Sequence, residues 1–258
     1  GLLAHDQTRR KRYLVASGAA WSVAYLARPL NLITLPLFLA ALWFVLSYRT
    51  GTALHPQADQ SAPVQRPISL AGLRAWWGTH WRPLVSFLVP VALAGLVSLW
   101  WNVARFGSLW ETGYAESERF NGDWLAGLYG LLAGPARGFF WYNPILLLAA
   151  VGASWFWRRM RWLLVLILAL ALTYWLVYGK WYMWHGGYSW GPRFLVPLTP
   201  LLALLVGPAW EKIVRRREWG WAGQLAVLVL RGLSVAVQWL GMLIPFSPVQ
   251  EWRATNHP

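Results

Sequence analysis

The chain has 258 residues, of which 57% are hydrophobic and only 12% charged, whereas an average soluble domain carries about 25% charged residues. Its formal net charge of +14 would suit a nucleic-acid-binding protein. The basic residues, however, form short clusters between apolar runs, as in the cytoplasmic loops of membrane proteins, so nucleic acid is excluded as a partner. The sequence contains no cysteine, which excludes disulfides and cysteine-ligated metals.

Two apolar runs near the N-terminus, residues 13–27 and 30–48, are separated by Arg28 and Pro29. A proline disfavours helical backbone at the residue before it, so Arg28 marks a helix end or a kink. The pattern predicts a helical hairpin or a broken helix.

The middle of the chain alternates polar and apolar stretches. Residues 49–67 have the composition of a loop, and residues 68–82 mix tryptophans with basic residues, which predicts a helix on the membrane surface. Residues 83–101 are long and apolar enough to span a bilayer. Residues 102–123 form a polar loop, and residues 124–134 are amphipathic, as expected at the interface. The polar loop holds four of the nine acidic residues: Glu111, Glu116, Glu118 and Asp123.

Four further spans are predicted in the second half, at residues 139–157, 162–178, 194–210 and 222–246. A loop rich in aromatic residues and glycine, residues 179–193, separates the second of these from the third. We therefore expect an all-α fold, a polytopic transmembrane helix bundle with short interfacial helices, and a single transmembrane domain over residues 1–258.

The basic clusters predict the orientation. If residues 9–12 are cytoplasmic, alternation of the spans also places residues 49–82, 158–161 and 211–221 on that side, in agreement with the excess of Lys and Arg in cytoplasmic loops. Residues 102–123 and 181–193 are then extracytoplasmic. The expected localisation is the cell membrane, with membrane lipids as partners.

The aromatic loop contains the most suggestive side chains. Aromatic faces suit the apolar faces of sugar rings, so His185, Tyr188 and Trp190 are sugar-binding candidates, and Arg193 can grip a phosphate by paired hydrogen bonds. The alternative is an aromatic belt at the membrane interface with a glycine-rich turn.

Three other residues are candidates outside that loop. Arg28, between two apolar runs, needs a partner such as a lipid phosphate or an acid, or else snorkels to the interface. Arg137 lies in a glycine-rich turn and is a candidate phosphate contact. Glu111 is the preferred acid/base or metal-contact candidate of its loop, although acidic loops are often solvated surface. The catalytic motifs of soluble enzymes, such as a Walker loop or His-Glu-x-x-His, are absent from the sequence.

Five stretches resemble the GT-C superfamily of membrane glycosyltransferases, in particular bacterial members related to protein O-mannosyltransferases. They occur in the expected order and cover most of the chain: Ala27–Asn31, Arg105–Ser108, Gly127–Pro144, Gly186–Arg193 and Ser234–Gly241. The resemblance implies an extracytoplasmic active site, a polyprenyl-phosphate-linked sugar as donor, often a divalent metal (Mg²⁺ or Mn²⁺), and a lipid, glycan or protein acceptor. It also implies roles for Arg28, Arg137 and Arg193 on the donor phosphate.

The chain departs from this family at its start. Such enzymes carry the catalytic acid in the first outer loop, which has no counterpart here, so the chain looks like the C-terminal portion of a longer cell-envelope enzyme, without its catalytic residue. The expected function is sugar transfer on the extracytoplasmic face. The alternatives are a transporter or lipid flippase, which needs polar residues facing each other in mid-membrane, and a non-catalytic membrane subunit.

Overall fold

The computed structural model describes residues 2–54, 70–111, 113–114, 118–135, 137–187 and 189–243. Helices occupy most of these residues, and no strand occurs among them, so the all-α fold class is confirmed. The chain divides into two compact units, Gly1–Tyr114 and Ala115–Pro258, here called unit 1 and unit 2. The expectation of a single transmembrane domain stays a prediction.

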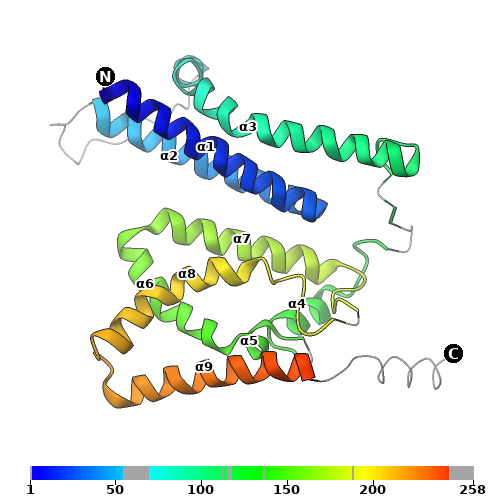
Figure 1. Ribbon diagram of the computed structural model, residues 1–258, viewed down its shortest axis with the longest axis vertical. Helices are drawn as coiled ribbons and strands as arrows, with labels where there is room; N and C mark the ends of the chain where they lie inside the picture. Colours follow the sequence, from blue (N-terminus) through cyan, green and yellow to red (C-terminus); the bar gives the residue numbers. More distant parts are fainter. Residues whose placement is uncertain are drawn as a thin grey trace. The chain divides into compact units, whose positions relative to one another are not determined.

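Unit 1 begins with the predicted break. Helix α1 (Leu2–Ala27) ends just before Arg28, whose backbone is extended (φ −153°, ψ 99°). The short helix η1 (Pro29–Thr34) then leads into α2 (Leu35–Leu54), which runs back in the opposite direction to α1 (Figure 1). The break at the residue before the proline is therefore confirmed, and the chain reverses its direction through η1.

Side chains hold this reversal together. The indole Nε1 of Trp21 donates to Thr34 Oγ1 at 3.0 Å, and the amide Nδ2 of Asn31 donates to the carbonyl of Ala24 at 2.7 Å. All three donor and acceptor side chains, of Trp21, Asn31 and Thr34, are buried. Their hydrogen bonds satisfy polar groups that would otherwise be costly to bury.

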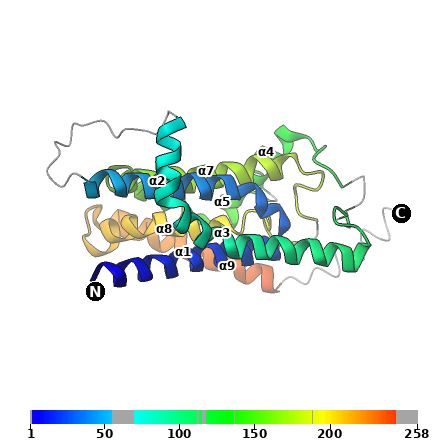
Figure 2. The same cartoon turned by 90° about the horizontal axis from the view of Figure 1, so that it is seen from above.

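The predicted surface helix and the following span form one continuous helix, α3 (Leu70–Phe106). The expectation of two separate elements was wrong, although the helix bends sharply in its first part (Figure 2). Pro83 and Pro90 lie inside it, and a proline kinks a helix because it removes one backbone hydrogen bond and clashes with the preceding turn. Helix α1 packs closely on α3, where Gly18 lies against the carbonyl of Phe87.

In unit 2 the predicted span over residues 139–157 is also wrong as a single helix. It is divided into α5 (Phe139–Tyr142), η2 (Pro144–Leu148) and α6 (Ala149–Arg159). Asn143, before Pro144, leaves the helical region (φ −137°, ψ 59°), for the same reason as Arg28.

The other predicted helices of unit 2 are present with shifted bounds. They are α4 (Trp124–Leu132), α7 (Arg161–Lys180), α8 (Leu198–Trp210) and α9 (Gly220–Leu243). The π-helical turn η3 (Glu211–Arg215) follows α8, at the start of a segment that was predicted to be a loop. The predicted span over 194–210 begins later because residues 194–197 are turns. Residues 244–246 of the last predicted span lie outside the described residues.

Small residues allow the helices of unit 2 to approach closely, as is common between membrane helices. Gly152 of α6 lies directly against the carbonyl of Leu205 in α8. Leu205 in turn shares a buried cluster with Ile167 of α7, and Ala209 and Ile213 form a second cluster with Val227 of α9. These contacts fix α6, α7, α8 and α9 relative to one another.

Four stretches in the described residues are long and apolar enough to cross a membrane: Pro29–Leu46, His80–Phe106, Arg161–Lys180 and Gly220–Leu243. They bury little of themselves within the protein, from 33% of the Arg161–Lys180 stretch to 6% of the Gly220–Leu243 stretch. Water would not tolerate so much exposed apolar helix surface, whereas lipid would. These helices are those of a membrane protein.

Unit 2 has two contrasting ends. The chain enters α7 at Arg161 and leaves it at Lys180, and α8 brings it back (Figure 1). Residues 158–161 and 211–217 therefore lie together at one end, here called the basic end. Residues 133–143 and 181–197 lie at the other, here called the loop end.

Candidate functional site

The aromatic loop is tied to the segment that precedes α4. The amide of Tyr182 donates to the carbonyl of Arg119 at 3.0 Å, and the amide of Gly122 donates to the carbonyl of Lys180 at 3.1 Å. The hydroxyl of Tyr182 donates to Glu118 Oε1 at 2.7 Å. The polar segment and the aromatic loop, far apart in the sequence, thus form one surface at the loop end.

Arg137 braces the glycine-rich part of the loop. Its guanidinium donates to the carbonyl of Gly187 at 2.7 Å, to that of Gly191 at 3.3 Å, and to that of Ser189. Three acceptors from one loop fix the path of its backbone, because a planar guanidinium offers its donors in a rigid fork. Arg137 therefore positions the loop, and its predicted contact with a donor phosphate stays a prediction.

The turn at Gly191 depends on glycine. Its φ of +69° is a conformation that other residues rarely adopt, and a Cβ there would lie 2.7 Å from the Tyr142 ring. On the neighbouring side, the Trp190 ring meets Tyr142 edge to face, with centroids 5.4 Å apart, and it packs on Gly241 of α9. Trp190 thus anchors the loop to the helices, and its sugar-binding role stays a prediction.

Arg193 differs from Arg137 in its surroundings. Its side chain is exposed and its guanidinium carbon lies 5.0 Å from the centre of the Phe194 ring. That ring stacks on Tyr178 of α7, with centroids 4.5 Å apart and planes 10° from parallel. Among the described residues, no carbonyl or carboxylate accepts a hydrogen bond from this guanidinium. Arg193 is thus held over an aromatic stack with its hydrogen-bond donors available.

His185 lies exposed on the same loop. Its Nδ1 accepts a hydrogen bond from the amide of Gly187 at 3.2 Å, which places the ring proton of the neutral form on Nε2. The neighbouring Trp184 ring contacts it edge to face at 5.7 Å. Tyr188, the third sugar-binding candidate, lies outside the described residues.

Two further candidates, Arg28 and Glu111, belong to unit 1. Arg28 lies half-buried at the break between α1 and η1, and Glu111 is exposed after the end of α3. Their predicted roles stay predictions. In unit 2, Glu118 contacts the loop through Tyr182, and the sequence alone did not single it out among four acids.

The described acidic residues near the loop end have partners within the protein. Asp123 caps α4, because its Oδ1 accepts from the amides of Leu125 and Ala126 at 3.0 and 3.2 Å. Glu118 accepts from Tyr182. In the described part of the chain, no three His, Asp or Glu side chains gather, although Mg²⁺ and Mn²⁺ require several oxygen ligands.

Two side chains that shape the loop end, Tyr142 and Phe194, were not identified as candidates from the sequence, and Glu118 was named only as one of four acids. The rings of Tyr142 and Phe194 contact Trp190 and Tyr178, which lie elsewhere in the chain. The glycine at 191 gave the strongest available signal, since it marks a tight turn.

Comparison with known proteins identified no relative of this chain. No known protein-family model matches the chain, and no curated protein or solved structure is significantly similar to it. The case for a function therefore depends on the geometry of the loop end.

Proposed function

We propose that the chain is part of an integral membrane glycosyltransferase whose loop end binds a polyprenyl-phosphate-linked sugar. The observation that carries the proposal is Arg193, an exposed guanidinium fixed over Phe194 on a loop that Arg137 braces. A planar guanidinium with available donors suits a phosphate, which it can grip by two parallel hydrogen bonds.

The proposed orientation places the loop end on the extracytoplasmic face. The basic end of unit 2 gathers Arg158, Arg159, Lys212 and Arg216 around one pocket, and such clusters remain on the cytoplasmic side of membranes. Because α7 separates the two ends and is long enough to span a bilayer, the loop end then faces outward. That side is where a lipid-linked sugar is used by the enzymes that the sequence resembles.

In the proposed reaction, the acceptor hydroxyl oxygen attacks the anomeric carbon of the sugar and forms a new C–O bond. The bond between that carbon and the phosphate oxygen breaks, and its electron pair leaves with the polyprenyl phosphate. Arg193 stabilises the charge that develops there. The hydroxyl proton passes to a base, because a hydroxyl is a weak nucleophile near neutral pH. The resembled enzymes supply that base from their first outer loop.

Within this chain, Glu118 replaces Glu111 as the proposed acid/base contact. Its Oε1 already accepts a hydrogen bond from Tyr182 in the aromatic loop, so it belongs to the same surface as Arg193 and His185. His185 and Trp190 are retained as proposed sugar contacts.

Donor binding tests the proposal. Residues 1–258 in nanodiscs of neutral lipid are titrated with a fluorescent polyprenyl-phosphate hexose. Loss of a charge-assisted hydrogen bond costs about 1.5–3 kcal/mol, so Arg193→Ala should weaken binding by roughly 10- to 150-fold, and Arg193→Lys should also weaken it. Arg217→Ala, which removes an exposed charge at the basic end, is the matched control. Unchanged affinity in Arg193→Ala would overturn the proposal.

A second arm separates sugar from phosphate recognition. The titration is repeated with polyprenyl phosphate that carries no sugar. His185→Ala should weaken binding of the hexose-bearing lipid and leave that of the bare lipid phosphate unchanged. Equal effects on both ligands would remove His185 from the sugar site.

A further inference from the structure

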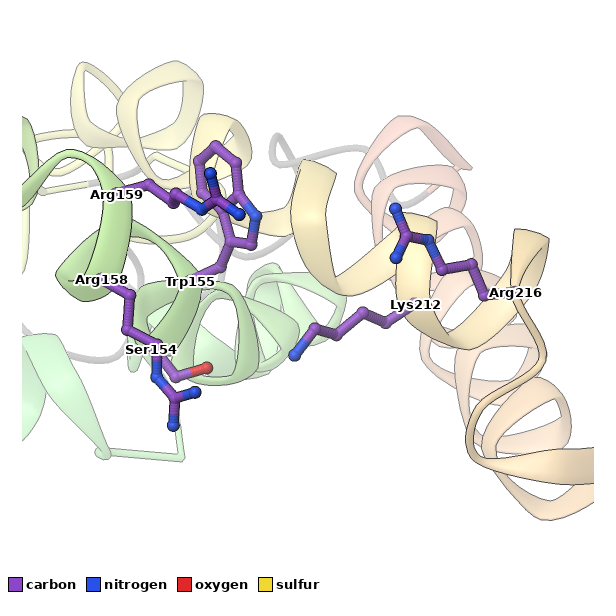
Figure 3. A pocket seen from close by; sticks show the side chains of 6 residues that line it. All are labelled: Ser154, Trp155, Arg158, Arg159, Lys212 and Arg216. Atoms are coloured by element: carbon purple, nitrogen blue, oxygen red, sulfur yellow. The ribbon is translucent and has the colours of Figure 1, made fainter.

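The basic end of unit 2 holds a pocket of about 320 Å³ between the last turns of α6 and the π-helical turn η3 (Figure 3). This size is at the small end of the range of about 300–1,000 Å³ found for ligand pockets. Six residues line the pocket: Ser154, Trp155, Arg158, Arg159, Lys212 and Arg216. Four of them are cationic and none is acidic. Figure 3 shows Lys212 extending from η3 toward the Ser154 side of α6.

Most of this charge has no counter-charge in the described residues. Glu211 contacts the cluster, but its two oxygens are shared between Arg215 at 3.1 Å and Arg216 at 3.4 Å. Within the part of the chain that the structure describes, Arg158, Arg159 and Lys212 form neither an ion pair nor a side-chain hydrogen bond. Three positive charges around one pocket are thus left to an outside partner.

The dipole of helix α6 is too weak to neutralise the positive charges around the pocket. Arg158 and Arg159 lie in the last turn of that helix, where the helix dipole is equivalent to roughly half a negative charge. This charge is smaller than that of either arginine, and Lys212 approaches from another element. Dipole complementarity therefore does not account for the cluster.

The backbone on both sides of the pocket is held by the packing of the helices. On α6, Phe156 points into the core between the residues that line the pocket, and on η3 Ile213 does the same beside Lys212. The close contact between Gly152 and Leu205 holds α6 against α8, which continues into η3. The cations are thus brought together by the packing of the helices, and they do not depend on a mobile loop.

We propose that this pocket binds a phosphate group, either in the headgroup of an anionic phospholipid or as a free ion. Two arginines and a lysine provide planar and point-charge donors for phosphate oxygens, and basic pockets between membrane helices bind anionic headgroups. The lipid is favoured by the exposed tryptophans at this end, which prefer the depth of lipid headgroups. They include Trp155, Trp157, Trp162 and Trp210. The proposal is independent of the function proposed for the loop end.

The test compares two double variants that remove the same charge from the same end. Arg158→Gln with Lys212→Gln removes two pocket cations, whereas Arg215→Gln with Arg217→Gln removes two cations that do not line it. Each protein, purified in neutral detergent, is titrated with soluble dioctanoyl-phosphatidylglycerol, with dioctanoyl-phosphatidylcholine as the uncharged comparison. Bound lipid is counted by native mass spectrometry, and circular dichroism verifies that each variant is folded.

The pocket variant should bind phosphatidylglycerol at least about tenfold more weakly than the wild type, since each charge-assisted hydrogen bond contributes a factor of that order. The control variant should stay within about threefold. Equal weakening in both variants would show only a diffuse attraction to the basic end and would overturn the site. So would equal binding of phosphatidylcholine by the wild type.

Inorganic phosphate distinguishes the two sources. If the headgroup is the ligand, 10-fold more phosphate than lipid should leave the bound lipid in place. If phosphate at a concentration equal to that of the lipid displaces the lipid from the wild type and from the control variant alike, the pocket binds the free ion. That result would overturn the assignment to a lipid headgroup.

Discussion

Arg137 at the loop end of unit 2 donates to three backbone carbonyls of its own chain, whereas Arg158, Arg159 and Lys212 at the basic end have no such partners among the described residues. The loop end therefore uses Arg137 to fix the loop backbone, and it presents the exposed Arg193 over an aromatic stack. The basic end gathers cations with one shared acid, Glu211. The contrast is between an end where an arginine holds a loop backbone in place and an end where three cations line one pocket without an ionic partner among the described residues.

The largest predicted effect concerns the apolar layer between these ends. Helix α7 has 20 residues, about 30 Å in length, which matches the hydrocarbon core of a bilayer. Leu172, in its middle, is 49% exposed. Leu172→Arg should lower membrane insertion of α7 by about 2.5–3.5 kcal/mol, measured as the inserted fraction with a glycosylation reporter.

Leu172→Phe is the control for this insertion test, because phenylalanine is also favourable in the core of the bilayer. In water, an exposed Leu→Arg change is nearly neutral. If the two variants were inserted equally or were equally soluble, α7 would not be surrounded by lipid. The loop end and the basic end would then not be separated by a membrane.

A smaller effect is expected where Arg137 braces the loop. Arg137→Lys replaces a planar fork by a point charge that cannot reach three carbonyls at once. Local opening of residues 186–193 should become easier by about 1.5–3 kcal/mol, measured by hydrogen–deuterium exchange of peptides from this loop. Arg193→Lys should leave the exchange unchanged, and similar exchange in both variants would contradict the assigned roles.

The smallest predicted effect concerns α4, which supports the loop end because Gly130 backs the Trp184 ring. Asp123→Ala removes the side chain that caps the first amides of α4 and should destabilise that helix by about 1 kcal/mol. Hydrogen exchange of the peptide that covers α4 measures it. Asp123→Asn keeps an acceptor and should stay close to the wild type, so a similar loss in both variants would argue against the cap.

The long helices could be predicted from the sequence because a helix that spans a bilayer needs a long run of apolar residues, which few other structures require. The break at Arg28–Pro29 was predictable from local sterics, and the same rule at Asn143–Pro144 would have divided the span that was wrongly predicted as one helix. It was not predictable that α3 is one continuous, bent helix, because helices in membranes tolerate prolines that helices of soluble proteins usually exclude.

The candidate site was predictable only in part. The composition of residues 181–193 indicated the aromatic loop, and Arg193 was identified there. The pairing of Arg137 with Gly187 and Gly191, and that of Glu118 with Tyr182, depends on contacts across 50 or more residues. No local pattern encodes such contacts, so a phosphate contact and a loop brace look alike in the sequence.

The separation of the two ends by a membrane is the central claim, and single-cysteine labelling tests it most directly, because the sequence has no native cysteine. His185→Cys reports the loop end, and Glu218→Cys reports an exposed position beside η3 at the basic end. In intact cells, an impermeant maleimide should label His185→Cys and should label Glu218→Cys only after permeabilisation. Labelling of both positions in intact cells, or of neither, would contradict the account.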